Sequence, residues 1–163
     1  MKRYNEFLLH VVLFLSAFLV VGSGSLAAAG ADLPVPAVNA PQGVALKGYD
    51  PVAYFVAGQP TKGVEQHSLV WQGATYRFAS EENQALFKAD PDKYLPQYGG
   101  YCAYAMSLDR IADIDPSRWA IVGEKLYLNN GLIAEKLWSL NKPGHIESAD
   151  RNWPRYPKQP AGK

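Results

Sequence analysis

The strongest constraint on the fold of this 163-residue chain is a β-hairpin signal followed directly by a helix signal, and it occurs twice. In the first copy, two short runs of apolar and aromatic residues within 69–78 flank Gln72-Gly73, a dipeptide typical of hairpin turns. Ser80 can then cap a helix, because its hydroxyl accepts a hydrogen bond from a free N–H of the first turn. Asp90-Pro91 ends this helix, since proline disfavours helical backbone at the residue before it.

The second copy has the same order further along the chain. Residues 119–128 turn at Gly123-Glu124, and a helix capped by Asn129 or Asn130 extends to Leu140. At an offset of 50 residues the copies align Gly73 with Gly123, Phe78 with Leu128, Ser80 with Asn130 and Phe87 with Leu137. A duplication and a chance recurrence of a common motif explain this alignment equally well. In both cases the pattern predicts an α+β fold of short antiparallel hairpins with helices packed against them.

The first 31 residues have the organisation of a secretory signal peptide. Lys2 and Arg3 give a positive start, and residues 7–21 are almost wholly apolar. This run is shorter than the roughly 20 residues that span a bilayer, and Ala29-Gly30-Ala31 fits a cleavage site. We therefore expect cleavage after Ala31 and an exported protein, periplasmic if the source is a Gram-negative bacterium. An uncleaved N-terminal anchor is the alternative.

Removal of residues 1–31 leaves a lead-in, one domain and a tail. Residues 32–43 are predicted to be an extended lead-in, 44–158 a single α+β domain with a last helix at 145–153, and 159–163 a disordered tail. The remaining chain has 14 basic and 14 acidic residues and no basic cluster. It therefore lacks the charge pattern of a protein that binds nucleic acid or, after cleavage, a membrane. Its single cysteine excludes an intrachain disulfide.

Three short blocks together resemble the YHS-domain family. They are KGYDPVAYF at 47–55, YRFASEEN at 76–83 and FKADPDKY at 87–94. The continuation QYGGYCAYAM at 97–106 and KLYLN at 125–129 resembles the exported branch of that family. The similarity covers about residues 44–129 and implies a small YHS-like domain suspected of binding a heavy metal.

The chain departs from the family at the cysteines on which its metal binding depends. The resemblance implies one cysteine after the first Asp-Pro and one after the Tyr-x-Phe block. Val52, Ala53 and Tyr54 follow Asp50-Pro51 instead, and Ala79, Ser80 and Asn83 stand after Tyr76-Arg77-Phe78. Metal binding therefore cannot be carried over to this chain residue by residue.

Cys102 is the remaining soft donor, and it defines the first functional hypothesis. If a helix begins after Gly99-Gly100, Cys102 and Met106 lie one turn apart on one face, and both sulfurs suit copper before zinc. His67 or His145 could complete such a site from a distant segment. The hypothesis is an exported binding module that holds a soft metal and has a metal-handling protein partner. Its structural alternative is a buried Cys102 with Met106 as a gap-filler.

Two further hypotheses need no metal. In one, the chain binds a small ligand or a partner, Cys102 is merely buried, and a pocket is lined by Tyr98, Tyr101 and Tyr104, with Asp50 as a further candidate. In the other, Cys102 is the nucleophile of a thiol enzyme. No catalytic motif surrounds this cysteine, which favours a module without enzymatic activity. The oligomeric state stays open.

Overall fold

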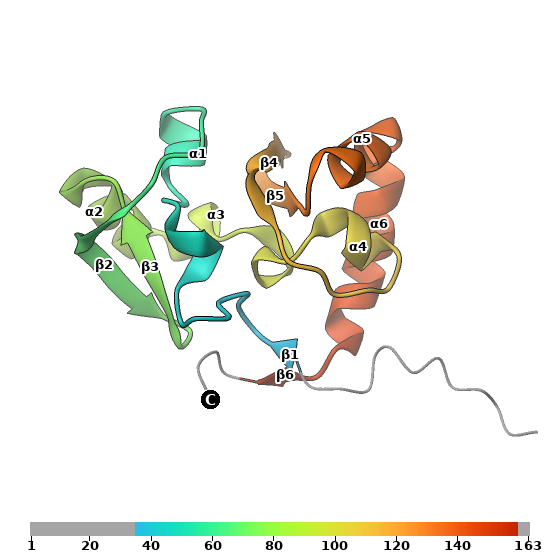
Figure 1. Cartoon of the computed structure of the whole chain (residues 1–163), viewed down its shortest axis with the longest axis horizontal. Helices are drawn as coiled ribbons and strands as arrows, with labels where there is room; N and C mark the ends of the chain where they lie inside the picture. The colour runs from blue at the N-terminus through green and yellow to red at the C-terminus, as the bar shows by residue number, and fades with distance from the viewer. Residues whose placement is uncertain (1–34, 160–163) are drawn as a thin grey trace, which may run out of the picture.

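The computed structural model describes residues 35–159, which form two consecutive halves of like architecture (Figure 1). The predicted signal peptide, its anchor alternative, residues 32–34 of the lead-in and residues 160–163 lie outside this range. Within it, no helix is both long enough and apolar enough to cross a membrane.

Each half follows the same order: a tight 3-10 turn, a short helix, a β-hairpin and two helices. The first repeat contains η1 (Ala45–Gly48), α1 (Ala53–Val56), β2 (Val64–Trp71), β3 (Ala74–Phe78), α2 (Glu81–Ala89) and α3 (Pro91–Tyr94). The second repeat contains η2 (Gln97–Gly100), α4 (Ala103–Ser107), β4 (Asp115–Val122), β5 (Lys125–Asn129), α5 (Leu132–Leu140) and α6 (Lys142–Asn152). A final turn η3 (Trp153–Arg155) leads to β6 (Lys158–Gln159), which pairs in parallel with β1 (Val35–Pro36).

The α+β prediction and both hairpins are confirmed. Strands β2 and β3 pair antiparallel, as do β4 and β5. The two turn residues of each hairpin, Gln72-Gly73 and Gly123-Glu124, all have positive φ. This is the backbone twist that two-residue hairpins favour.

The two hairpins superimpose in register at an offset of 51 residues, so the predicted offset of 50 is wrong. Both pairings shift at the same place, between Val64 and Ser68 in β2 and between Asp115 and Trp119 in β4. The alignment by sequence failed because glycine occupies the second turn position in one hairpin and the first in the other. In the structure Phe78 therefore corresponds to Asn129, Phe87 to Trp138 and Ser80 to Gly131.

The equivalence extends beyond the hairpins to the turns and helix caps. Turns η1 and η2 each contain three consecutive residues with positive φ, at 46–48 and 98–100. Asp90 caps α3 and Asn141 caps α6, and each side chain accepts a bond from the N–H three residues on. So many shared backbone details favour duplication over chance.

The last helix begins earlier than predicted. Residues 145–153 were expected, but α6 starts at Lys142, with Asn141 as its cap. Pro143 does not prevent this, because an N–H in the first turn needs no partner inside the helix. At the chain end, Gln159 pairs with Pro36 in the β1–β6 ladder instead of lying in a tail.

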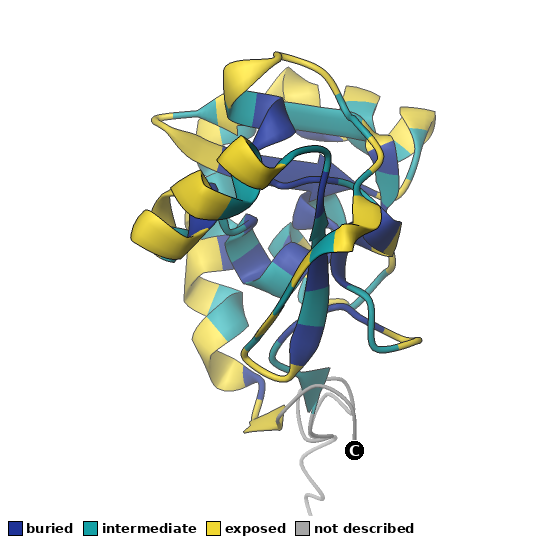
Figure 2. Ribbon diagram, turned by 90° about the vertical axis from the view of Figure 1, so that its left-hand side faces the viewer, coloured by how far each residue is buried: buried dark blue, intermediate teal, exposed yellow. Residues whose placement is uncertain are grey.

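Two hydrophobic clusters form the interior, and strand β5 lies between them. Leu126 and Leu128 pack into the cluster of the first repeat, whereas Tyr127 packs into that of the second. This follows from the alternation of side chains along a strand. Buried residues gather on the inside of the strands, while the outer turns of the helices are exposed (Figure 2). The first repeat thus takes part of its core from the second.

Candidate functional site

Cys102 lies where the sequence predicted, at the N-terminal end of a short helix after a tight turn. Gly99 and Gly100 have positive φ, and Cys102 is the N-cap of α4. Gly99 is needed for a second reason, because an added Cβ would lie 2.1 Å from the carbonyl oxygen of Ala37. The turn therefore sets the direction in which the cysteine side chain enters the core, where it is 1% exposed.

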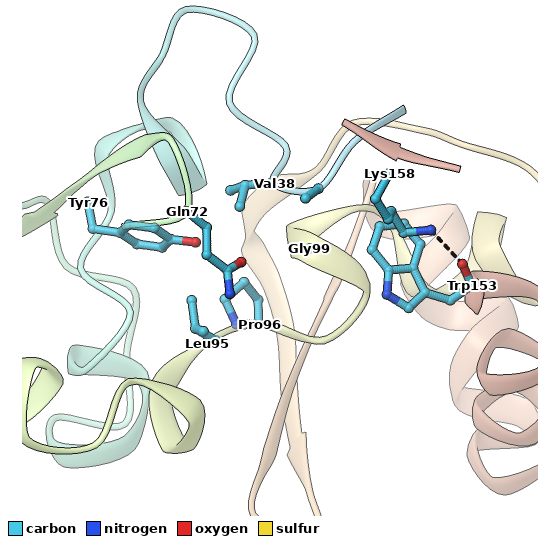
Figure 3. Close-up of a pocket in the computed structure, with 9 residues that line it drawn as sticks. Val38, Gln72, Tyr76, Leu95, Pro96, Gly99, Trp153 and Lys158 are labelled. Atoms are coloured by element: carbon cyan, nitrogen blue, oxygen red, sulfur yellow. Dashed lines mark hydrogen bonds between the residues drawn. The ribbon is translucent and has the colours of Figure 1, made fainter. Parts of the chain in front are cut away.

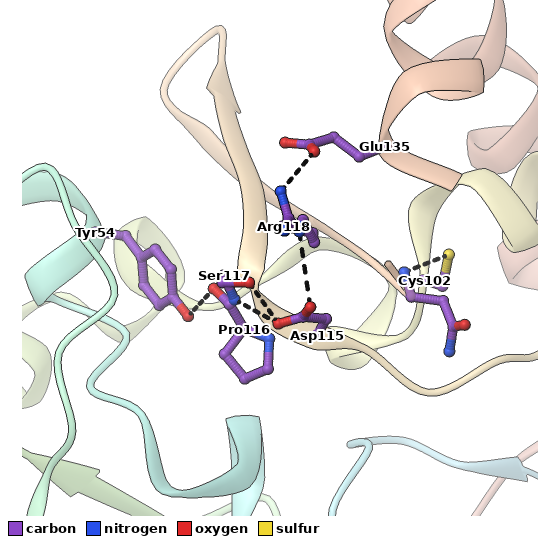
Figure 4. A network of polar contacts seen from close by, with 8 residues as sticks. Tyr54, Cys102, Asp115, Pro116, Ser117, Arg118 and Glu135 are labelled. Carbon is purple, nitrogen blue, oxygen red and sulfur yellow. Dashed lines mark hydrogen bonds and ion pairs between the residues drawn. The ribbon is translucent and has the colours of Figure 1, made fainter. Parts of the chain in front are cut away.

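The sulfur of Cys102 is surrounded by hydrogen-bond partners from this chain. It accepts from the backbone N–H of Ala105 at 3.4 Å and from that of Asn130 at 3.2 Å. The second contact joins α4 to the end of β5 (Figure 4). The side-chain oxygen of Asn129 lies 3.9 Å from the sulfur and can accept the thiol proton. Cys102 is thus a junction between two elements of the second repeat.

Asp50 occupies the equivalent position in the first repeat. Each residue follows its 3-10 turn by two positions, and each carboxylate oxygen of the fully buried Asp50 accepts two hydrogen bonds. These donors are Val52 N at 2.8 Å and Ala53 N at 3.3 Å for Oδ1, and Ala79 N at 2.8 Å and Asn83 Nδ2 at 2.6 Å for Oδ2. The candidate ligand residue Asp50 is therefore an internal anchor for α1 and the β3–α2 junction.

A cysteine has one acceptor atom where an aspartate has two, and Asn129 supplies the second acceptor. Its Oδ1 accepts from the backbone N–H of Tyr104 at 3.2 Å, the donor that corresponds to Val52 N in the first repeat. Cys102 and Asn129 together thus replace Asp50 and Phe78. After this exchange the Nδ2 of Asn129 has no hydrogen-bond partner, and water cannot supply one because the residue is 0% exposed.

The other predicted metal ligands lie on three different elements. Met106 is fully buried in the same helix, and its N–H donates to the carbonyl of Cys102. His145 Nδ1 lies 3.1 Å from Ser107 Oγ, and His67 lies on β2 in the first repeat. Among the described residues, no three His, Cys, Asp or Glu side chains are close enough to hold a metal ion. The donor set around Cys102 does not fit a metal centre of that kind.

The three predicted pocket tyrosines make contacts within the protein. Tyr98 donates to Asp150 at 2.9 Å, and Tyr101 donates to Pro36 O at 3.3 Å. Tyr104 packs edge-on against the ring of His145. Burial, together with the bond to Asp150, raises the pKa of Tyr98 above its ordinary range.

Two cavities lie where the repeats meet, and other residues line them. The smaller, about 240 Å³, lies between Tyr76, Gly99 and Trp153 (Figure 3). The ammonium group of Lys158 beside it is already bonded to Trp153 O at 2.6 Å and rests on the indole ring. The larger, about 480 Å³, is open and has the surface ion pair between Lys47 and Asp113 at its wall. The charged side chains that line the two cavities, Lys158, Lys47, Asp113 and Arg77, thus have partners within the protein.

Helix α5 exposes an apolar stripe. Ile133 is 76% exposed, Leu137 39% and Leu140 81%, and their spacing places them on one face of the helix. The opposite face buries Trp138. We call Ile133, Leu137 and Leu140, together with the neighbouring Leu132, the α5 stripe.

Helix α2 is the internal reference for this surface. At the positions equivalent to Leu132, Ile133 and Leu140 it carries Glu81, Glu82 and Ala89. The fold therefore does not require apolar residues there. Contiguous exposed apolar patches larger than a few hundred Å² are uncommon in monomeric proteins and mark interaction sites.

A polar network fixes α5 to its hairpin (Figure 4). Arg118 of β4 contacts Glu135 of α5 at 3.4 Å and Asp115 at 3.7 Å. Next to it, Tyr54 of the first repeat donates to Pro116 O at 3.0 Å. The α5 stripe thus lies on a helix whose position is fixed by the hairpin. Lys136 and Lys142 are the cations next to the stripe.

Comparison with known proteins assigns a family to the first repeat. The family model of the YHS domain matches residues 52–98. Residues 52–98, most of the first repeat, thus match a YHS domain. YHS domains are small units often linked to metal handling, and the match ends before Cys102 and α5. No curated protein and no solved structure gave a match.

Sequence reasoning missed Asn129 and the α5 stripe. Asn129 was considered only as a helix cap, because its contact with Cys102 joins residues 27 positions apart. The stripe had a detectable signal. Residues 132–140 carry more large apolar side chains than one buried helix face can accommodate.

Proposed function

We propose that this chain is an exported YHS-type module that binds a protein partner through the α5 stripe, with Cys102 as a core residue of the resting protein. The observation that carries the proposal is the contrast between α5 and α2. At equivalent, exposed positions of one fold, Leu132 and Ile133 replace two glutamates. An apolar surface that the fold does not need is retained when a partner covers it.

The charges around the stripe favour an acidic partner. Lys136 is exposed on α5, and Lys142 follows directly, with its ammonium group 5.4 Å from the ring centre of Trp138. The carboxylate of Glu135 is engaged by Arg118. The partner should therefore combine an apolar contact surface with carboxylates at its edge, because such charges speed association and select among partners.

A second copy of the chain fits this surface less well. A symmetric pairing of stripes would bring the two Lys136 side chains towards each other. Soft-metal binding through Cys102 and Met106 is supported by their one-turn spacing. Both side chains are buried, however, and among the described residues no three His, Cys, Asp or Glu side chains are close enough to hold a metal ion, which favours the partner-binding function.

Site-specific photo-crosslinking tests the proposal in the native compartment. A photoreactive residue at position 133 should trap one discrete protein, whereas the same residue at the equivalent position 82 should not. With that protein purified, Ile133→Glu should weaken binding at least tenfold, the usual loss at a buried contact centre. Glu82→Ala is the matched control and should leave the Kd unchanged.

The alternatives give distinct outcomes. Light scattering that shows a dimer dissociated by Ile133→Glu would replace the partner with a second copy. Flotation with anionic vesicles would replace it with a lipid surface. Equal trapping at positions 82 and 133, or equal affinity of the wild type and the Ile133→Glu variant, would refute the proposal.

A further inference from the structure

The pair Cys102 and Asn129 carries a cost that the first repeat avoids. Phe78 fills the equivalent position beside Asp50 without any polar atom, whereas Asn129 leaves its Nδ2 buried and unpartnered. A buried donor without an acceptor is destabilising. The first repeat folds with Asp50 and Phe78 at these two positions. The fold therefore does not explain why the second repeat has a sulfur and an unpartnered N–H group there.

The first repeat shows what this position holds when all its donors are used. There, two oxygen atoms on one planar carboxylate accept four hydrogen bonds. In the second repeat one sulfur atom accepts two, from Ala105 N and Asn130 N. The unpartnered Nδ2 of Asn129 belongs to a side chain in contact with that sulfur. The three backbone N–H groups at this position all have an acceptor, and Asn129 Nδ2 is the buried donor beside the sulfur that an added acceptor atom would satisfy.

We propose that Cys102 is an oxidation site at which a hydroperoxide converts the thiol into a sulfinic acid that is retained in an anion site of the Asp50 type. A sulfinate carries two oxygens and one negative charge, like a carboxylate. Its oxygens would accept from the N–H groups that now meet the sulfur and from Asn129 Nδ2. Oxidised Cys102 would thus reproduce in the second repeat the anchoring that Asp50 gives to the first.

The chemistry proceeds in two balanced steps. The sulfur attacks one peroxide oxygen, an S–O bond forms as the O–O bond breaks, and the thiol proton leaves with the departing oxygen as water or an alcohol. Sulfur loses two electrons and the peroxide gains them, which gives the sulfenic acid. A second peroxide repeats the step and gives the sulfinic acid.

Access to the sulfur favours small oxidants. Cys102 is 1% exposed, but the N–H that it accepts belongs to Asn130, which is exposed. The sulfur therefore lies directly beneath the β5–α5 loop. Hydrogen peroxide is close to water in size and needs a smaller opening of this loop than an alkylating reagent does.

Mass spectrometry and thermal unfolding of the mature chain test the proposal. Hydrogen peroxide should add two oxygen atoms to Cys102 in the folded protein, while a maleimide should label this thiol only after unfolding. Met106→Leu removes the buried methionine as another acceptor of oxygen, and Cys102→Ser in this background should show no gain at this peptide. The Tm of the oxidised protein should rise by about 3–5 °C, the shift expected from roughly one added net hydrogen bond in a domain of this size.

Asn129→Leu separates the anion site from mere oxidation. This variant should still gain two oxygens, but its Tm should not rise. A thiol that stays reduced until the protein unfolds would overturn the proposal. So would a Tm that falls on oxidation, or oxidation that runs on to the sulfonic acid, since either result shows that the site does not accommodate the sulfinate.

Discussion

Replacing the carboxylate of Asp50 by an amide should destabilise the protein far more than the same change at Asp90. In Asp50→Asn, Oδ1 keeps its bonds to the N–H groups of Val52 and Ala53. The new NH₂ group takes the place of Oδ2 and faces two donors, Ala79 N and Asn83 Nδ2. Two hydrogen bonds to a charged group are lost, and two donors lose their acceptor.

The expected magnitude follows from those two bonds. Hydrogen bonds to charged groups contribute about 1.5–3 kcal/mol each, so the free energy of unfolding should fall by about 3–6 kcal/mol. That is a large part of the 5–15 kcal/mol typical of a domain. In urea, with a slope of about 1–3 kcal/mol per molar, the midpoint should move down by roughly 2 M at an unchanged slope.

Asp90→Asn is the matched control. Asp90 caps α3 through the N–H of Lys93, and Asn141 caps α6 in the same way at the equivalent position. The fold therefore already accepts asparagine there, and this variant should remain within about 0.5 kcal/mol of the wild type. If both variants lose the same stability, or Asp50→Asn loses under about 1 kcal/mol, the role given to the buried carboxylate is wrong.

Two further predictions use the repeats and the buried phenols. Gly131, which provides no side-chain cap to α5, has extended backbone and open space at its Cβ position. Gly131→Ser should therefore reproduce the cap that Ser80 gives α2, a gain of a few tenths of a kcal/mol, and raise the Tm by about 1–2 °C in differential scanning calorimetry. The pKa of Tyr98 is raised by burial and by Asp150, so the folded state keeps this proton longer than the unfolded state. Its contribution to stability is complete below about pH 10 and falls as the pH rises further, and Tyr98→Phe should flatten the alkaline decline of Tm measured between about pH 8 and pH 11.

Local signals in the sequence predicted the parts of the fold that depend on neighbouring residues. The hairpin turns, the Ser80 cap and the position of Cys102 at the start of a helix all follow from dipeptides, capping residues or glycines a few positions away. The start of α6 was missed by three residues, because proline is read as the end of a helix although it also fits the first turn.

Features that depend on distant contacts could not be predicted in the same way. The offset of 51 could not be recognised from the sequence because the turn glycine occupies different positions in the two repeats. The residue equivalent to Gly123 in the first turn is Gln72. The pairing of Cys102 with Asn129 requires the path of the chain between them. The exposure of Leu140 depends on which side of α5 faces the core, and the sequence offers apolar residues on both sides.

The position of β5 between the two cores affects the order in which the protein can be completed during synthesis. The first repeat ends at Tyr94, but its core also contains Ile114, Leu126 and Leu128. A ribosome that adds about 5–20 residues per second needs roughly 2–7 s more to reach Leu128 after Tyr94. During this interval strand β5 has not been synthesised, so the first repeat exposes the apolar residues that β5 later covers. A chaperone that holds nascent chains therefore has a defined interval in which to act, and it ends when the second hairpin emerges.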